Sequence, residues 1–323
     1  MSMNRRTLAW LILLAVPTSL ALAVWNGSVD IPAARLLAAL SGGGDSIDRE
    51  IVWGLRAPRA LAAFACGALL ALAGTLLQAL LRNPLADPFL LGVSGGAAAG
   101  ALTAMLIGAG LALQHLFAFA GAAFATASVF AFSLRPSGWN AYRVILAGVA
   151  LSAGFGAVVS LLLALAPAAQ VHGMLFWLLG DLSGATDPLP AWLVLGVAAV
   201  VAQSQAAPLD LLALGEDKAR SLGVAVMAVQ SITFGCAALA TMAAVLLGGS
   251  IGFVGLVTPH LLRLMGVHDH RMLLPLSLAA GGSLLALADA VARSVPAPVE
   301  LPVGIVTALV GVPALLFLLT RTR

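Results

Sequence analysis

Charged side chains are scarce in this sequence. Of its 323 residues only 9% are Asp, Glu, Lys or Arg, while 61% are hydrophobic. Soluble domains usually carry about 25% charged residues. A soluble fold of this size would lack the polar shell needed to cover so much apolar side chain. The composition therefore excludes a soluble enzyme, a nucleic-acid-binding protein and a disordered chain, and leaves an integral membrane protein with many spans.

Lysine, cysteine and histidine are sparse as well. No glycine-rich Walker A sequence precedes the single lysine, Lys218, which excludes ATP hydrolysis by a P-loop. Cys66 and Cys236 fall inside predicted helices without metal or redox spacing, so we expect them to pack as small hydrophobic residues. His268 and His270 stand in a short loop that we expect to be solvated and to hold no metal.

Long uncharged stretches predict the membrane spans. They cover residues 7–29, 60–81, 88–134, 144–180, 188–209, 221–262, 272–288 and 301–320. A helical span needs roughly 20 apolar residues, so 88–134 and 221–262 each hold two spans, and 144–180 holds one span and an amphipathic piece near 174–179. We predict an all-α membrane protein of ten transmembrane helices in one domain, 1–323. Continuous Ala/Leu-rich runs exclude an alternating outer-membrane barrel.

The basic residues divide unequally between the two ends of the predicted spans. With both termini inside, eleven are cytoplasmic: Arg5, Arg6, Arg82, Arg135, Arg143, Lys218, Arg220, Arg263, Arg271, Arg321 and Arg323. Five are outside: Arg35, Arg49, Arg56, Arg59 and Arg293. The positive-inside rule therefore places both termini in the cytoplasm. We predict an uncleaved first span; a signal peptide ending at residues 21–23 is the alternative and would leave nine spans.

Two segments are similar to each other. Residues 64–69 align with residues 234–239, and Ala73, Leu76 and Leu77 match Ala243, Leu246 and Leu247 at the same offset. Five intervening helices would place the copies in opposite orientations, which is an inverted repeat. Chance similarity in an Ala/Leu-rich chain is the alternative. Glycines recur within the spans, where they indicate close helix packing or, alternatively, the lining of a wide passage.

The longest predicted cytoplasmic loop, residues 208–223, differs from the other loops. It is typical of two short helices broken at Gly215. Its apolar residues Leu211, Leu212, Leu214 and Leu222 would be exposed to the cytosol, which predicts a partner protein that covers them. A solvated connector is the alternative.

Ionisable residues at membrane depth are few. Asp289 lies within a span, Arg293 one turn later can pair with it, and Gln78 is a further buried polar residue. So few ionisable groups at membrane depth argue against ion-coupled transport. Arg56, Arg59 and Arg293 lie on the outer side, against the charge rule. They predict a docking site for acidic residues of a soluble partner, with lipid-headgroup anchoring as the alternative.

Several blocks of the sequence resemble the FecCD family of ABC importer permeases. They are residues 56–63 with Arg56-Ala57-Pro58-Arg59, residues 67–78, Arg82-Asn83-Pro84-Leu85-Ala86-Asp87-Pro88, Leu91-Gly92-Val93, residues 146–151, Leu214-Gly215-Glu216 with Ala219 and Leu222-Gly223, residues 252–263, Asp269-His270-Arg271, Ala288-Asp289 with Arg293, and Glu300-Leu301-Pro302-Val303-Gly304. The blocks follow one another in the family's order from the second span to the last.

The resemblance implies a type II ABC importer permease fold of ten helices with an inverted repeat. It implies a homodimer in the bacterial inner membrane, with the passage along the two-fold axis. Two copies of a separate cytoplasmic ATPase subunit would use the ATP, and a periplasmic substrate-binding protein would deliver a metal chelate. This chain would bind no cofactor or metal and would not be an enzyme. Ferric siderophore, haem and cobalamin are all open as the chelate.

The resemblance also implies roles for individual residues. Arg56, Arg59 and Arg293 would dock the binding protein. The residues that would contact the ATPase are Leu211, Leu214, Gly215, Glu216, Ala219, Arg220, Leu222 and Gly223. Asn83 and Leu85 would form the cytoplasmic gate, and Asn140 stands where other members can have small hydroxyl residues at a second gate. Gly148, Ser152, Gly156 and Ser160 would line the passage from one face of the fifth helix.

Two other classes of function remain as alternatives. One is an ion-coupled secondary transporter, in which Asp289 would be the ionisable group at membrane depth. The other is a membrane-embedded enzyme that uses the loop of His268 and His270.

Overall fold

The computed structural model describes residues 4–135, 138–295 and 299–321, which are helical apart from one short strand pairing and the connecting loops. The elements are α1 (Arg5–Trp25), α2 (Ala33–Leu40), α3 (Ser46–Arg49), the π-helix η1 (Glu50–Arg56), α4 (Ala57–Leu80), the 3-10 helix η2 (Pro88–Leu91), α5 (Val93–Leu106), α6 (Leu111–Ser133), β1 (Leu134–Arg135), β2 (Gly138–Trp139), α7 (Ala141–Leu165), α8 (Ala168–Leu179), α9 (Leu189–Ser204), α10 (Ala206–Ala213), α11 (Glu216–Ser221), α12 (Val226–Gly248), α13 (Val254–Leu264), α14 (His270–Ser294) and α15 (Val303–Arg321).

Polar side chains mark where several helices begin. The side chains of Asn4, Asp45, Asp87, Asn140 and Asp269 each accept a hydrogen bond from a backbone N–H of the first turn that follows. These caps satisfy N–H groups that have no partner within a helix. The runs between the polar positions are rich in Ala and Leu, which favour helix and are at home in lipid.

The ten predicted spans correspond to helices of unequal length. Among the described residues six helices are long and apolar enough to cross a membrane, and the bent pair α9–α10 makes a seventh. The shorter apolar helices α5, α13 and α15 correspond to the other three, and the piece predicted near 174–179 lies in α8, which is a further short apolar helix. Since α13 has 11 residues, it is only about 16 Å long at 1.5 Å per residue and cannot cross a bilayer by itself.

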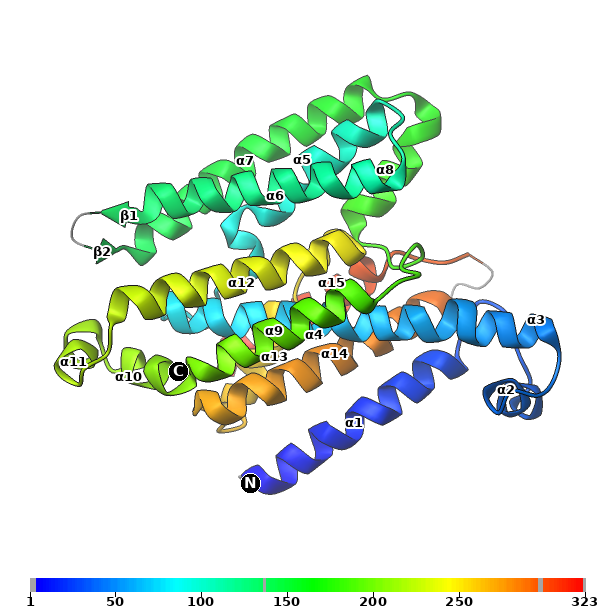
Figure 1. Cartoon of the computed structure of the whole chain (residues 1–323), viewed down its shortest axis with the longest axis horizontal. Helices are drawn as coiled ribbons and strands as arrows, with labels where there is room; N and C mark the ends of the chain where they lie inside the picture. Colours follow the sequence, from blue (N-terminus) through cyan, green and yellow to red (C-terminus); the bar gives the residue numbers. More distant parts are fainter. Residues whose placement is uncertain (1–3, 136–137, 296–298, 322–323) are drawn as a thin grey trace.

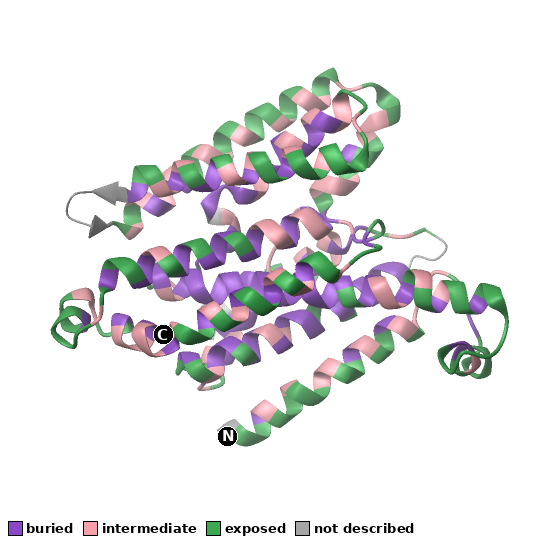
Figure 2. Cartoon of the chain, in the orientation of Figure 1, coloured by how far each residue is buried: buried purple, intermediate pink, exposed green. Residues whose placement is uncertain are grey.

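The helix α4 forms the centre of the molecule. Nearly all of it is buried, and it packs against α14, α12, α13 and α9 (Figures 1 and 2). A Cβ atom on Gly67 would lie 2.3 Å from the carbonyl oxygen of Gly281, and one on Gly74 would lie 1.7 Å from that of Gly255. Such contacts require glycine, because they bring one backbone directly against another. Helix packing is therefore the role of these two glycines.

The helices α4 and α12 carry the two copies of the predicted repeat. They lie against each other and run in opposite directions (Figure 1), as an inverted repeat requires. The Cys66 thiol donates a hydrogen bond to the carbonyl oxygen of Ala244 across this contact, at 3.5 Å. Cys66 and Cys236 are both buried and free, which confirms that they pack as small hydrophobic residues.

The helices α5, α6 and α7 form a layer beside this core (Figure 1). Gly96 of α5 meets Gly121 of α6, where a Cβ atom on Gly96 would lie 2.3 Å from the carbonyl oxygen of Gly121. The helix α7 is covered least among the long helices, with 11% of its most apolar window buried, against 94% for the helix that contains α4 (Figure 2). Its surface is thus left for lipid or for another protein.

The two ends of the molecule are built from different elements. The start of α1 and the end of α15 lie on the same side as α10 and α11, whereas α2 and α3 lie on the opposite side, where the long helix containing α4 begins (Figure 1). We call these the terminal end and the α2 end. Both chain ends therefore lie on one side of the bundle, as the sequence predicts.

Candidate functional site

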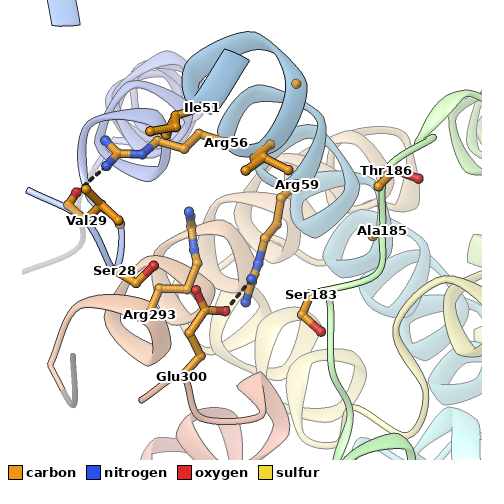
Figure 3. A pocket seen from close by; sticks show the side chains of 13 residues that line it. Ser28, Val29, Ile51, Arg56, Arg59, Ser183, Ala185, Thr186, Arg293 and Glu300 are labelled. Atoms are coloured by element: carbon orange, nitrogen blue, oxygen red, sulfur yellow. Dashed lines mark hydrogen bonds and ion pairs between the residues drawn. The ribbon is translucent and has the colours of Figure 1, made fainter. Parts of the chain in front are cut away.

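A cluster of charged side chains lies at the α2 end. Arg56 ends η1 and Arg59 lies one turn later in α4, while Arg293 lies in the last turn of α14. Because α4 and α14 pack in opposite directions, the start of one meets the end of the other, so residues far apart in the sequence converge here (Figure 3). We call Arg56, Arg59, Arg293, Asp289 and Glu300 the guanidinium cluster.

Asp289 is the anionic centre of the cluster and is fully buried. Arg59 donates to its Oδ1 with Nη2 at 3.0 Å and with Nε at 3.2 Å, and Arg293 pairs with its Oδ2 at 3.0 Å. The i,i+4 pair of Asp289 with Arg293 was predicted from spacing and is confirmed. Each oxygen of this buried carboxylate thus has its own guanidinium partner, so Asp289 holds α4 and α14 together at this end.

Glu300 completes the acidic half of the cluster. Its Oε2 accepts a hydrogen bond from Nη1 of Arg59 at 2.6 Å. Burial alone would raise the pKa of Glu300, but the hydrogen bond from Arg59, together with the charges of Arg59 and Arg293, lowers this pKa below its usual range. Glu300 is therefore ionised at neutral pH.

Arg56 is held in a different way. Its Nη1 donates to the carbonyl oxygens of Val24 at 3.2 Å and Trp25 at 2.8 Å, and its Nη2 donates to that of Val29. These carbonyls end α1 and begin the next loop, so the guanidinium caps the negative end of a helix. Exposed Asp30 attracts Arg56 electrostatically. Within the cluster, Arg59 and Arg293 form the ion pairs with Asp289 and Glu300. The guanidinium cluster therefore carries an excess positive charge, which Arg56 supplies.

A pocket of about 260 Å³ opens beside the cluster and is lined by all three arginines, Glu300 and the hydroxyls of Ser28, Ser183 and Thr186 (Figure 3). The exposed fractions of Arg56, Arg59 and Arg293 are only 4%, 9% and 3%. An acidic partner would therefore have to reach the guanidinium groups through the mouth of the pocket and not across a flat surface.

The predicted loop at the terminal end folds as two short helices, α10 and α11. They break at Gly215, whose φ of +114° is in the region that favours glycine. Leu214 and Leu222 are 59% and 57% exposed, as predicted. The expectation for Leu212 was wrong: it is 1% exposed, because one face of α10 packs on the core of its own chain. We call α10 and α11 with the intervening turn the coupling segment.

The other predicted ATPase-contact residues occupy different surroundings. Leu211 is half-buried and Gly223 is exposed, and Arg220 lies 3.6 Å from Glu216 on α11. Ala219 is completely buried against its own chain, so it positions α11 and does not lie on its outer surface. These positions follow from helix periodicity, since consecutive residues of an α-helix point about 100° apart.

The predicted gate residues Asn83 and Leu85 lie in the turn after α4, also at the terminal end. The Asn83 side chain accepts a hydrogen bond from the N–H of Leu85 at 2.9 Å, and Leu85 is 39% exposed. We call residues 82–87 the gate loop. Asn140 is exposed and caps α7 through the N–H of Arg143 at 3.3 Å, so its described contact is structural.

The four predicted passage residues of α7 do not share one environment. Gly148 is buried, Ser152 is half-buried, and Gly156 and Ser160 are exposed. Residues four apart on an α-helix are offset by about 40°, so the direction changes by about 120° from the first to the last. The four residues thus spread over about a third of the helix circumference.

Sequence reasoning missed two contacts of the coupling segment. Arg82 pairs with Glu216 at 2.8 Å, and Nδ1 of His270 lies 2.5 Å from Oδ1 of Asp210. The expectation that His270 is solvated was wrong, since it is 5% exposed and holds α10 against α14. Within the described ranges no group of three or more potential metal ligands occurs.

Comparisons with known proteins agree with this geometry. The model of the FecCD transport family matches residues 11–321. The chain is 37% identical over 325 residues to the vitamin B12 import system permease protein BtuC of Shigella boydii serotype 18 (strain CDC 3083-94 / BS512), covering 99% of this chain and 97% of the relative. It is 40% identical over 277 residues to the protein of the same name from Escherichia coli O9:H4 (strain HS), covering 84% of both.

A solved structure extends the likeness to three dimensions. A metal-chelate type ABC transporter in an inward-facing conformation superposes with a TM-score of 0.86. The sequences are 30% identical, and the superposition covers 98% of this chain and 100% of the other. The resemblance therefore includes the short helices and both ends of the molecule.

Proposed function

The chain belongs to the FecCD transport family, and we propose that it works as a homodimer whose two-fold axis is the passage for a corrinoid. It is a multi-pass permease subunit of a bacterial metal-chelate ABC importer and is not an enzyme. Membership in the family implies an ATPase partner and a substrate-binding protein. The energy for transport comes from the ATPase, so this chain provides the passage and the surfaces that its partners contact.

The separation of two polar sites at opposite ends of an apolar bundle carries this proposal. The guanidinium cluster lies at the α2 end and the coupling segment at the terminal end (Figure 1). With the termini in the cytoplasm, as the positive-inside rule predicts, the cluster faces the periplasm and the coupling segment faces the ATPase. A delivered chelate would then enter at one end and leave at the other.

The guanidinium cluster suits the docking of an acidic partner. A carboxylate that enters its pocket meets the excess charge of Arg56 and the hydroxyl groups on the pocket wall. Charge-assisted hydrogen bonds from arginine to carboxylate are strong and directional. Arg59 and Arg293 keep their pairing with Asp289 in this arrangement and present their outer edges to the pocket.

The coupling segment suits a hydrophobic contact with the ATPase. Exposed Leu214 and Leu222 flank the charged residues of α11, so a groove in the partner can bury both leucines while polar groups remain at the edge. The proposed contact region also includes Leu211, Gly215, Glu216, Arg220 and Gly223. Ala219 is buried against the rest of its own chain and positions α11.

A second copy of the chain is the proposed cover for α7. This helix leaves small residues exposed, and no heavy atom lies within 4 Å of a Cβ built on Gly154 or Gly156. Pairing through this face would enclose a passage lined by small side chains, which leave room for a bulky solute. Ser152 and Ser160 would then face the passage in place of lipid.

Cobalamin is the chelate that we propose, since the two relatives described above import vitamin B12 by name. The test reconstitutes the permease with its ATPase and binding protein in proteoliposomes and measures uptake of radiolabelled cyanocobalamin, a ferric siderophore or haem. We expect ATP-dependent uptake of cyanocobalamin. Uptake of a different chelate would overturn the substrate assignment, and uptake driven by a proton or sodium gradient without ATP would overturn the mechanism.

A further inference from the structure

Arg82 has a backbone conformation that arginine seldom adopts. It follows the last turn of α4 with φ at +48°, in the left-handed region where glycine and asparagine are favoured. Its N–H donates to the carbonyl of Ala79 at 3.3 Å, so the conformation closes the helix end. The backbone alone would favour glycine at this position. A strained residue with a long side chain points to a role for that side chain.

The Arg82 side chain reaches the coupling segment. Its Nη2 donates to Oε1 of Glu216, the first residue of α11, at 2.8 Å. The same carboxylate oxygen accepts a hydrogen bond from Nε2 of Gln230 in α12 at 3.2 Å, and Arg220 lies 3.6 Å from the other oxygen. Glu216 therefore joins the gate loop, α11 and α12 at one point.

The coupling segment has one fixed end and one exchangeable end. At α10, Oδ1 of Asp210 accepts a hydrogen bond from the backbone N–H of His270 at 3.1 Å and also contacts its ring; the side chains of His270 and Asp210 are 6% and 35% exposed. At α11, the side chains of Arg82 and Glu216 are 42% and 33% exposed. Exposed ion pairs are weak and exchange partners readily, whereas Asp210 is held at two points by a buried residue, through its backbone N–H and its ring.

We propose that Arg82 is a positioning residue that transmits movement of α11 to the gate loop through Glu216. The inference rests on the proposed contact between the coupling segment and the ATPase. When the ATPase moves α11 about the Asp210–His270 contact, Glu216 pulls or releases Arg82 at the base of the gate loop. Asn83 and Leu85 follow directly in the chain, so the turn that presents them shifts with Arg82.

The movement can be measured without a chelate. In the complete complex with ATPase and binding protein, Leu85→Cys is labelled with a maleimide, and the labelling rate is compared without nucleotide and in an ATP-trapped state. Cys66 and Cys236 are 0% and 7% exposed and give little background. We expect the nucleotide to change the labelling rate by about tenfold when Arg82 is present. With Arg82→Gly, which suits the backbone, we expect this change to fall below about twofold.

Two further variants separate transmission from a structural role. Arg82→Gly should leave the melting temperature unchanged or higher, because it relieves the left-handed backbone. Charge reversal by Arg82→Glu or Glu216→Arg should abolish the nucleotide effect, and the double exchange should restore it. Arg6→Gln, which removes the same charge at the same end, is the control and should label like the parent.

The proposal is overturned if Arg82→Gly retains the full nucleotide effect, if the double exchange fails to restore it, or if the parent shows none. Failure of cyanocobalamin uptake would instead concern the proposed substrate, because the labelling assay contains no chelate. Whether the ATPase contacts α11 is measured separately, by how strongly the ATPase protects Lys218 from an amine reagent.

Discussion

Arg56 differs from the other two arginines of the guanidinium cluster because it forms no ion pair with Asp289. Arg59 and Arg293 both neutralise buried Asp289, so replacing either removes one of the two cationic partners of a buried carboxylate and destabilises the fold. Arg56 contacts carbonyl groups at the end of α1. We expect Arg56→Gln to weaken binding of the binding protein about tenfold and to reduce its salt dependence while the fold persists.

The matched control for this prediction is Arg49→Gln. Arg49 lies exposed at the α2 end, so its replacement removes the same charge from the same end of the molecule. Affinity is measured by surface plasmon resonance on nanodisc-embedded permease at two salt concentrations. Equal losses of affinity in both variants would indicate general electrostatic attraction and would count against a pocket for a carboxylate.

Asp87 in the gate loop gives a prediction about pH. Burial raises the pKa of its carboxyl group to about 6, partly opposed by the hydrogen bond from the N–H of Phe89. The usual value is 3.8, so between about pH 4 and 6 the folded chain holds a proton that the unfolded chain releases. This group's contribution to the free energy of unfolding therefore falls as pH rises through that range.

Asp87→Asn removes this titration. The melting temperature of the unchanged protein minus that of the variant should become more positive as pH is lowered from 7 to 5. Differential scanning fluorimetry in detergent measures it, and Asp217→Asn, which removes an exposed carboxylate at the terminal end, is the control. A difference that is constant with pH for Asp87→Asn would refute the raised pKa.

At the scale of residues, sequence reasoning succeeds where partners are local. The spacing of Asp289 and Arg293 predicts their pairing, because residues four apart share a helix face. The contact of Arg59 with Asp289 joins positions 230 residues apart, and Arg82 with Glu216 joins positions 134 apart. No periodicity relates such positions, so these contacts follow only from the packing of α4 against α14 and of the coupling segment against α4.

At the scale of elements, the contact between α4 and α13 depends on glycine. A Cβ atom on Gly74 would lie 1.7 Å from the carbonyl oxygen of Gly255, so Gly74→Ala must force the helices apart. We expect a loss of about 1–3 kcal/mol in the free energy of unfolding. The control is Gly235→Ala in α12, where nothing lies within 4 Å of the added atom. Similar melting temperatures for the two variants would contradict this packing.

The elements themselves were predicted with mixed success. Uncharged runs locate the long helices correctly, because burial in lipid excludes charge along the whole run. The same criterion is uninformative about length within a run: residues 221–262 hold the 23-residue α12 and the 11-residue α13. The helices α2 and α3 and the π-helix η1 were not predicted, since they are short and lie among charged residues where hydropathy gives no signal.

At the scale of the whole molecule, the single lysine can show both which side of the membrane the coupling segment faces and whether it contacts the ATPase. Lys218 is exposed on α11 beside the leucines proposed to meet the ATPase. If the termini are cytoplasmic, a membrane-impermeant amine reagent modifies Lys218 in inside-out vesicles and leaves it unmodified in right-side-out vesicles. Binding of the ATPase should then slow the modification about tenfold, as expected for a residue that becomes covered by a tight partner. Mass spectrometry of the Lys218 peptide separates it from ATPase lysines, and Lys218→Arg provides the blank. Modification from the outside would reverse the orientation, and unchanged reactivity in the complex would remove α11 from the ATPase contact.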